Sequence, residues 1–371
     1  MIQFLISILV VLAILVVLVV IHEFGHFIVA RRAHVRVHEF GIGFPPRARI
    51  LGRDKETVYT LNWLPLGGFV RLEGEEGESD DPRAFVNAKL RTRLVILFAG
   101  VGMNFLLAFV IFMLIAWFSD PTWTARVGLV QPGSPAAAAG IKAGTQIGTD
   151  ANGNPTYDES GDLIVAVDGQ RFTVFDSDGP QISNYLHAHA GQTVTVTLQH
   201  ADGTESTVTT TLRPPEQASN GALGVSLTFE NTGSVTHDPL TAVSLGFHRT
   251  IDASTLILRT LGDLVTNVNS ISNPPVSGPI GIVTTVNTVR TELPPVYLFW
   301  LIGLLSANLA VVNVLPLPPL DGGRIFMSIL QKVTGNRVNP GLERAFYLAG
   351  FLFLMTFLVW ISYFDIQRSA G

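Results

Sequence analysis

Residues 2–26 read IQFLISILVVLAILVVLVVIHEFGH and join a long apolar run to a short polar motif. The run at 4–21 carries no charge and is long enough to cross the hydrocarbon core of a bilayer as a helix. Helical spacing places His22 and His26 one turn apart on one face, about 6 Å along the axis. Two imidazoles so placed can bind one Zn²⁺, with Glu23 beside them as a general base toward water. The motif therefore predicts hydrolytic chemistry at the edge of a membrane or inside it.

The motif alone leaves a second interpretation open, a polar cluster at the membrane–water interface, where His and Glu are common. The composition favours a membrane protein, because 47% of the 371 residues are hydrophobic and only 14% are charged. The absence of cysteine excludes thiolate zinc ligands and disulfides. No basic stripe interleaved with aromatic residues is present, so nucleic acid is not an expected partner.

Three more apolar stretches are long enough to span a bilayer, which predicts four transmembrane helices. Lys and Arg number twelve in residues 31–93 but seven in the longer segment 119–295. The positive-inside rule then places both chain termini and the segment 119–295 outside the cytoplasm. The predicted parts are a first span (1–30), a cytoplasmic segment with a membrane-associated β-hairpin (31–93), a second span (94–118), a β-rich domain (119–230), an amphipathic helical region (231–295), a third span (296–331) and a fourth span (345–365).

The outward segment shows two patterns. Strand-like runs occur at 163–167, 193–198 and 207–212, and Asp202-Gly203 is a turn signal between the last two. After Asp238-Pro239, an N-cap and first-turn proline, apolar residues recur at helical spacing. Charged residues interrupt this second pattern. We therefore expect a helix that lies along the membrane surface or packs on the core, and not a fifth span.

The third apolar stretch ends in NVLPLPPLDGG at residues 313–323. An aspartate at the end of an apolar helix is costly unless a positive charge compensates it, and zinc would do so. Asp321 could complete a two-histidine, one-aspartate ligand set that keeps an open position, as a catalytic zinc site requires. The predicted topology puts both motifs at the same depth. The alternative is a helix-terminating Asp-Gly-Gly turn at the cytoplasmic surface.

The two motifs together resemble the site-2 protease family of intramembrane zinc metalloproteases, in particular its bacterial RseP-like branch. The resemblance implies a polytopic α-helical membrane protein with an inserted β-rich, PDZ-like extracytoplasmic domain, in a bacterial cytoplasmic membrane. Further segments carry the resemblance: FAGVGMN at 98–104, GGFVR at 67–71, GPIG at 278–281, and the PDZ-like VQPGSPA at 130–136, AGIKAG at 139–144 and DLIVAVDG at 162–169.

Two departures from the family pattern stand out. Residues 145–161 interrupt the PDZ-like pattern, and their Asp, Asn and Gly content predicts a surface loop. Arg324 stands where the family often has histidine after DGG. Because arginine keeps its charge and has no acceptor, we expect it to contact a carboxylate or a lipid headgroup. The acidic segment 73–81 is expected to be a solvated loop without chemistry.

The expected reaction is hydrolysis of a peptide bond in or beside a transmembrane segment of another protein. Zn²⁺ would be held by His22, His26 and Asp321, and Glu23 would move the proton from water to the leaving amine. Asn104 and Asn313 would contact substrate or form helix–helix hydrogen bonds. A hairpin formed by 57–61 and 68–72 would offer its edge, at Gly68, Phe69 and Val70, to an unwound substrate strand.

The resemblance also implies partners. They are single-span membrane proteins such as anti-sigma factors and signal-peptide remnants, the surrounding lipid bilayer, and peptide termini at the PDZ-like domain, which would delay cleavage until the substrate has been trimmed. Two rival classes remain. One is a catalytically silent, membrane-anchored PDZ scaffold. The other is an ion-coupled transporter, although no internal repeat supports it.

Overall fold

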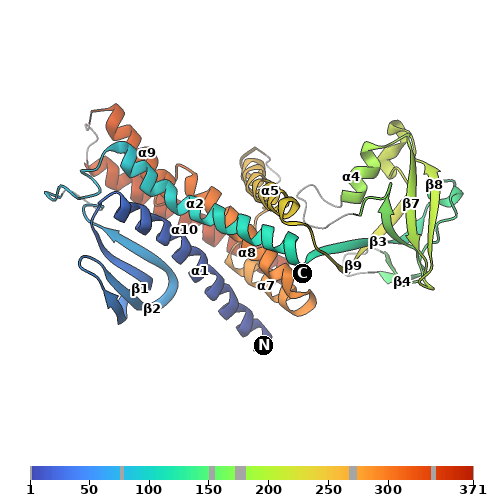
Figure 1. Ribbon diagram of the computed structural model, residues 1–371, viewed down its shortest axis with the longest axis horizontal. Coiled ribbons are helices and arrows are strands. Elements are labelled where there is room, and N and C mark those ends of the chain that lie inside the picture. The colour runs from blue at the N-terminus through green and yellow to red at the C-terminus, as the bar shows by residue number, and fades with distance from the viewer. Residues whose placement is uncertain are drawn as a thin grey trace. The chain divides into compact units, whose positions relative to one another are not determined.

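The computed structural model describes residues 2–75, 79–149, 155–171, 181–266, 274–335 and 340–370 (Figure 1). The chain forms two compact units. One comprises Met1–Met113 and Ser244–Gly371, and the other comprises Leu114–Val243. The second unit is thus an insertion within the first, and each is described by itself below.

Four helices of the described residues are long and apolar enough to cross a membrane, judged by length and composition. Each of the four transmembrane segments predicted from the sequence therefore contains a helix of this kind. Continuous apolar side chains favour them, because a lipid-exposed backbone must satisfy its hydrogen bonds within the segment. They are α1 (Ile2–Arg32), α2 (Leu90–Phe118), α8 (Pro295–Val314) and α10 (Pro340–Ala370).

The prediction of one continuous third span through residue 331 is wrong. Helix α8 ends at Val314, and a separate helix, α9 (Asp321–Val333), begins at Asp321. The intervening prolines 316, 318 and 319 cannot donate helical hydrogen bonds and end the first helix. Asp321 therefore begins a helix rather than ending one. Gly322 follows it, where a Cβ atom would lie 2.5 Å from the carbonyl carbon of Val314, so only glycine allows this close return of the chain.

The segment between the first two spans forms a long antiparallel ribbon of β1 (Val37–Arg53) and β2 (Val58–Leu72) (Figure 1). The predicted hairpin of 57–61 with 68–72 is wrong in its pairing. Both stretches belong to the β2 side of the ribbon, and Phe40 of β1 pairs with Tyr59 and also with Val70. The first half of β1 thus lies between the two halves of β2. Three glycines and two prolines within β1 interrupt the apolar alternation, which concealed this strand.

The ribbon packs against α1. A Cβ atom on Gly68 would lie 3.2 Å from Cγ2 of Val20, which shows how close the two backbones are. A buried cluster joins the ends of α1, α2 and the ribbon, and it includes Phe27, Ala30, Val37, Leu72, Ile96 and Leu97. Burial of these apolar side chains anchors the ribbon beside the C-terminal half of α1.

The opposite end of α1 is tied to α7 (Pro279–Glu292) by polar contacts. Ser7 Oγ donates to Oδ1 of Asn287 at 3.0 Å, and Arg290 Nη2 donates to Oε1 of Gln3 at 2.8 Å. The carboxylate of Asp365 in α10 accepts a hydrogen bond from the N–H of Gly281 at 2.8 Å. The GPIG segment thus begins α7 against α10.

The inserted unit is built on a five-stranded antiparallel sheet with the order β8-β7-β6-β3-β9. The three predicted strands are confirmed as β6, β7 and β8, and the 202–203 turn joins the last two. The strands of this sheet are β3 (Asp120–Val130), β6 (Leu163–Val167), β7 (Thr193–Gln199), β8 (Glu205–Thr211) and β9 (Val225–Val235). Two short α-helices in the described part of the unit accompany them, α3 (Pro135–Ala138) and α4 (Gln181–Ala188).

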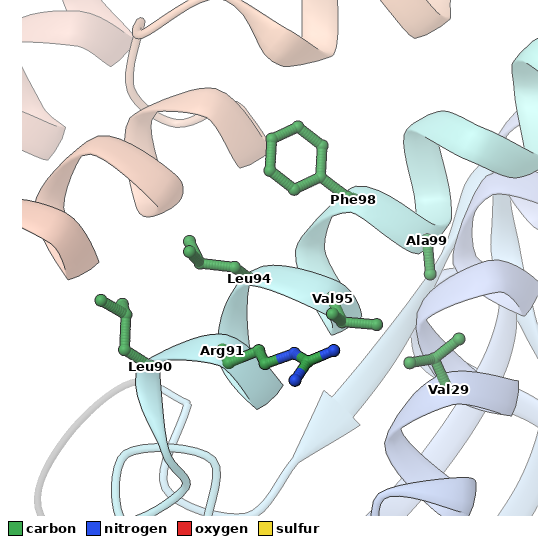
Figure 2. A pocket seen from close by; sticks show the side chains of 7 residues that line it. All are labelled: Val29, Leu90, Arg91, Leu94, Val95, Phe98 and Ala99. Atoms are coloured by element: carbon green, nitrogen blue, oxygen red, sulfur yellow. The ribbon is translucent and has the colours of Figure 1, made fainter.

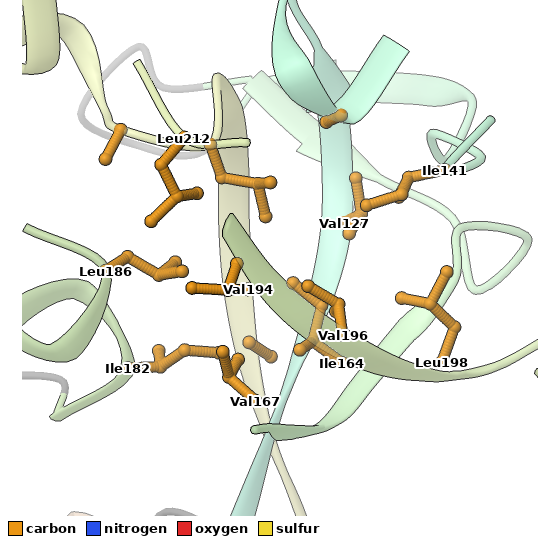
Figure 3. Close-up of a cluster of buried hydrophobic side chains, with 14 of the residues drawn as sticks. Val127, Ile141, Ile164, Val167, Ile182, Leu186, Val194, Val196, Leu198 and Leu212 are labelled. Carbon is orange, nitrogen blue, oxygen red and sulfur yellow. The ribbon is translucent and has the colours of Figure 1, made fainter. Parts of the chain in front are cut away.

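Apolar side chains from the sheet and α4 form the core of this unit (Figure 3). Val127 of β3, Val196 of β7 and Leu186 of α4 are all buried in this core, as Figure 3 shows. Alternate residues of each strand face this cluster, because successive side chains of a strand point to opposite faces. The inserted unit therefore has a hydrophobic core of its own.

The interrupting segment 145–161 is not the plain loop expected from its composition. Strands β4 (Gln146–Thr149) and β5 (Pro155–Tyr157) pair antiparallel, and residues 150–154 lie outside the described part of the chain. The base of this pair is closed by Asp158, whose Oδ1 accepts from the N–H of Thr145 at 2.8 Å. Its surface location is confirmed, because every residue of β4 is exposed.

The predicted amphipathic helix is confirmed as α5 (Pro239–Thr266), and it is not among the four candidate spans. Asp238 Oδ1 accepts hydrogen bonds from the N–H groups of Leu240 and Thr241, so it caps the helix as expected. Gly246 lies against the backbone of Met113 in α2, where an added Cβ atom would be 2.8 Å from Cα. Helix α5 therefore packs on α2 within the first unit.

Candidate metal centre

Helix α1 presents His22 and His26 on one buried face, as the four-residue spacing predicts. Their exposed fractions are 6% and 7%, and their ring centroids are 4.7 Å apart. Both Nε2 atoms face each other at 3.1 Å. The two imidazoles therefore converge on one point beside the helix.

Asp321 reaches the same point from the first residue of α9. Its Oδ2 atom lies 2.8 Å from Nε2 of His22 and 3.2 Å from Nε2 of His26. The proline-rich turn after α8 brings this carboxylate back against α1, almost 300 positions from the histidines in sequence. The structure therefore brings together the three side chains that the sequence predicts as a ligand set.

The three converging atoms suit a zinc ion. Ligand atoms about 2.0–2.1 Å from a tetrahedral zinc are separated from one another by about 3.3 Å. The observed separations of 2.8, 3.1 and 3.2 Å are slightly shorter than this spacing. Two imidazole nitrogens and one carboxylate oxygen are also the donor types of open, catalytic zinc sites. The residues present therefore fit this metal.

The second ring nitrogen of His26 has a partner that fixes the imidazole. Nδ1 of His26 lies 2.8 Å from the backbone carbonyl oxygen of Ile96 in α2. A carbonyl can only accept, so Nδ1 carries the proton and Nε2 is left with the lone pair that a metal requires. The α2 backbone thus sets the tautomer of this histidine.

Glu23 lies next to the two histidines and touches the β-ribbon. Its donor atom and those of His22 and His26 all lie within 4.8 Å of one another. Glu23 Oε2 accepts a hydrogen bond from the N–H of Val70 in β2 at 3.1 Å. The ribbon therefore positions this carboxylate beside the metal-binding face.

Helix α2 lines the other side of the two imidazoles. A Cβ atom on Gly100 would lie 2.7 Å from Nε2 of His22, so no larger residue fits at this position. One turn further along, Nδ2 of Asn104 lies 3.3 Å from Nδ1 of His22, and Asn104 is fully buried. Gly100 was not singled out from the sequence, although its spacing of four from Asn104 is the signal that could have identified it.

The remaining predicted site residues fall in different surroundings. Val70 touches Glu23, and Gly68 packs on α1, while the ring of Phe69 lies against Gly41 within the ribbon. Asn313 is buried in α8, and in the described part of the chain it forms no hydrogen bond to His22, His26 or Asp321. The geometry thus links Asn104 to a candidate ligand, whereas it shows no such link for Asn313.

Among the described residues of the acidic segment 73–81, three carboxylates are paired and Asp80 is exposed, so the prediction of a solvated loop holds only in part. Glu75 forms an ion pair with Arg324 of α9, and its Oε2 also accepts from the N–H of Leu72 at 3.2 Å. Glu73 pairs with His38. The expectation that Arg324 contacts a carboxylate is confirmed, and the contact ties α9 to the end of β2.

An apolar groove of about 630 Å³ lies between α1 and the start of α2 (Figure 2). Its lining is almost entirely apolar, with Arg91 as the charged exception. None of the three converging donors lines it, so the groove is distinct from the metal centre. Its lining residues are Val29, Leu90, Arg91, Leu94, Val95, Phe98 and Ala99.

Comparison with known proteins gives the class to which this fold and centre belong. The sequence profile of peptidase family M50 matches residues 10–357, and the chain therefore belongs to this family, the site-2 proteases. A Clostridium acetobutylicum protein named as a zinc metalloprotease is 31% identical over 351 residues, which cover 94% of both chains. The zinc metalloproteases RasP of Oceanobacillus iheyensis and Geobacillus kaustophilus are 28% and 27% identical, and each match covers 95% of this chain and at least 95% of the relative.

Membership of this family establishes the broad activity. The protein is a zinc metalloprotease of the site-2 type, and its four apolar helices make it a multi-pass membrane protein. None of the relatives named above is described as a scaffold or a transporter.

Proposed function

We propose that this protease hydrolyses peptide bonds in or near the transmembrane segments of single-span membrane proteins, with zinc held by His22, His26 and Asp321. One observation carries the proposal. Three donor atoms from α1 and α9 converge within 3.2 Å of one another, next to the carboxylate of Glu23. This centre lies on a helix with the length and hydropathy of a membrane span. The apolar core of a bilayer excludes water, so the metal centre would have to bring water to the peptide bond at this depth.

Bound zinc would polarise the scissile carbonyl and make water a stronger nucleophile at neutral pH. Glu23 would take the proton from the attacking water and then deliver it to the leaving amine. Its contact with the N–H of Val70 would hold the carboxylate toward the centre during both transfers. His22 and His26 are buried, so the surrounding protein would shield the metal centre from bulk solvent.

The membrane orientation that we propose places both chain termini and the inserted β-rich unit outside the cytoplasm. The basic residues of 31–93 and the basic last turn of α1, Arg31 and Arg32, support it. The metal centre would then lie in the cytoplasmic half of the bilayer, and the ribbon β1–β2 would lie beside it. A bacterial cytoplasmic membrane is the setting that the bacterial relatives suggest.

We infer that a substrate strand would bind at the side of β2 that carries the contact with Glu23. The N–H groups of Val70 and Leu72 donate to the carboxylates of Glu23 and Glu75. An edge with outward N–H groups can accept an added strand. A helical substrate must unwind to be cleaved, since its backbone groups are otherwise paired. Pairing with β2 at Gly68, Phe69 and Val70 would stabilise the unwound form beside Glu23, and Asn313 remains a candidate substrate contact on α8.

Substituting Val70 by proline should lower the rate of substrate cleavage about 10- to 100-fold while zinc stays bound. Proline removes the N–H group that holds Glu23 beside the proposed substrate strand, and it is tolerated at the edge of a sheet. Val70→Ala is the matched control, because it shortens the side chain but keeps the N–H. Cleavage by Val70→Pro at the wild-type rate in reconstituted vesicles would exclude a role for this edge.

The inserted unit is proposed to be a PDZ-like domain that delays cleavage until the outer part of a substrate has been removed. Its segments 130–144 and 162–169 carry the resemblance, and its independent core supports a separate module. Anti-sigma factors and signal-peptide remnants are the proposed substrates. The domain would exclude bulky outer parts or bind newly exposed peptide termini.

The proposed function can be tested with the purified protein in lipid vesicles that contain a single-span substrate. We expect cleavage of a substrate whose outer part has been shortened, and much slower cleavage of the full-length form. Treatment with a zinc chelator should stop cleavage of the shortened form, and added Zn²⁺ should restore it. Cleavage that persists without metal would contradict the mechanism. A protein that binds peptide termini but neither binds zinc nor cleaves would instead be the silent scaffold.

A further inference from the structure

We propose that Asn104 is a positioning residue that fixes the orientation and tautomer of His22, and that Gly100 provides the space for this contact. The inference rests on the proposed function, in which His22 Nε2 binds zinc. Gly100 and Asn104 are four residues apart, so they lie on the same face of α2, about 6 Å apart along its axis. On that face, Gly100 lies near Nε2 of His22 and Asn104 lies near Nδ1 of the same imidazole.

The two positions meet opposite ends of the ring. Gly100 lies against both imidazoles, because an added Cβ atom would be 2.7 Å from Nε2 of His22 and closer still to Nε2 of His26. Asn104 lies beside Nδ1 of the same ring, with its Nδ2 atom at 3.3 Å. Any side chain at 100 would push the two imidazoles out of place, and any shorter side chain at 104 would leave Nδ1 of His22 without its neighbour. One helix face therefore sets the position of the first predicted ligand.

The chemistry of the amide explains why asparagine stands here. When Nε2 of a neutral histidine binds a metal, Nδ1 carries the proton and needs an acceptor. The Oδ1 atom of Asn104 is buried and has no hydrogen-bond partner among the described residues. A half-turn of the amide exchanges Nδ2 and Oδ1, which brings this acceptor to Nδ1. Asn104 would thus do for His22 what the carbonyl of Ile96 does for His26.

The neighbouring helix holds Asn104 in place. Ser306 of α8 donates from Oγ to the backbone carbonyl oxygen of Asn104 at 2.8 Å, and both residues are fully buried. This contact takes the carbonyl of Asn104 and leaves its side-chain amide directed at His22. The arrangement joins three predicted spans, α1, α2 and α8, at the depth of the metal centre.

The test is the zinc affinity of the full-length protein in detergent, measured by competition with a chelator. In Asn104→Leu, which keeps the volume but removes the acceptor, the Kd for zinc should rise about 10- to 100-fold. Asn104→Ala is expected to show the same loss of zinc affinity, and it replaces the leucine variant if that variant does not fold. Asn104→Asp keeps an acceptor and should stay within a few-fold of wild type.

A matched control separates this role from the loss of any interhelical hydrogen bond. Asn287→Leu removes the contact with Ser7 at the far end of α1, and its zinc affinity should be unchanged. Wild-type affinity in both Asn104→Leu and Asn104→Ala would overturn the inference, and so would an equal loss in Asn104→Asp and Asn104→Leu. If the wild type itself binds no zinc, the proposed function fails instead.

Discussion

Replacing Glu23 by glutamine is expected to reduce the rate of cleavage of a single-span substrate about 10²- to 10⁴-fold, while zinc remains bound. Glutamine has the same shape as glutamate, and its side-chain oxygen can still accept from the N–H of Val70. It cannot take a proton from water. The substitution therefore separates proton transfer from the placement of the side chain.

The measurement compares fragments of a co-expressed substrate in cells that produce wild type or Glu23→Gln, alongside zinc analysis of both purified proteins. Intact substrate should accumulate with the variant, whereas both proteins should contain about one zinc per chain. Glu343→Gln, at the start of α10, is the control for loss of a carboxylate elsewhere and should cleave normally. Undiminished cleavage by Glu23→Gln would mean that another group is the base.

The second large effect is expected from His22→Ala/His26→Ala, which should lose both zinc and cleavage. Two of the three converging donors are removed, and Asp321 alone cannot hold the metal tightly. Zinc content should fall from about one per chain to below about a tenth. The readout is metal analysis of the purified double variant, supported by its retention of helical structure.

His200 offers a control for this experiment. In the inserted unit, Nδ1 of His200 lies 2.7 Å from Oδ1 of the buried Asp162, so it is another close His–Asp pair. Its Nε2 lies 2.8 Å from Oγ of Ser206, which makes it part of a hydrogen-bond network instead of a cluster of metal donors. His200→Ala should therefore keep its zinc. Zinc retained by the double variant and lost in His200→Ala would move the metal site to the inserted unit.

The features predictable from sequence are those that depend on local spacing. The histidines of α1 share a face because four residues make about one helical turn, and the alternation in 193–198 is that of a strand. Asp321 could be paired with the histidines because its sequence neighbourhood and expected depth matched theirs. For the same reason, the four apolar helices were predictable in number and approximate position.

The features that could not be predicted depend on contacts between distant residues or on breaks in a pattern. The strand β1 was hidden because glycine and proline interrupt its alternation, so the ribbon was paired incorrectly. The division between α8 and α9 was missed because apolar residues continue across the prolines. The proximity of Asn104 and His22 follows from the packing of α2 on α1, which no local pattern encodes.

The length of α1 between its basic end and the metal centre sets a distance that any substrate must match. Arg32 closes the helix, and His26 and His22 lie six and ten residues before it, which corresponds to about 9 and 15 Å of helix. A substrate strand in extended form covers that distance with about three to five residues, whereas a helix needs six to ten. In the membrane orientation proposed above, the enzyme would cut an unwound substrate a few residues inside the membrane boundary that lies beside Arg32.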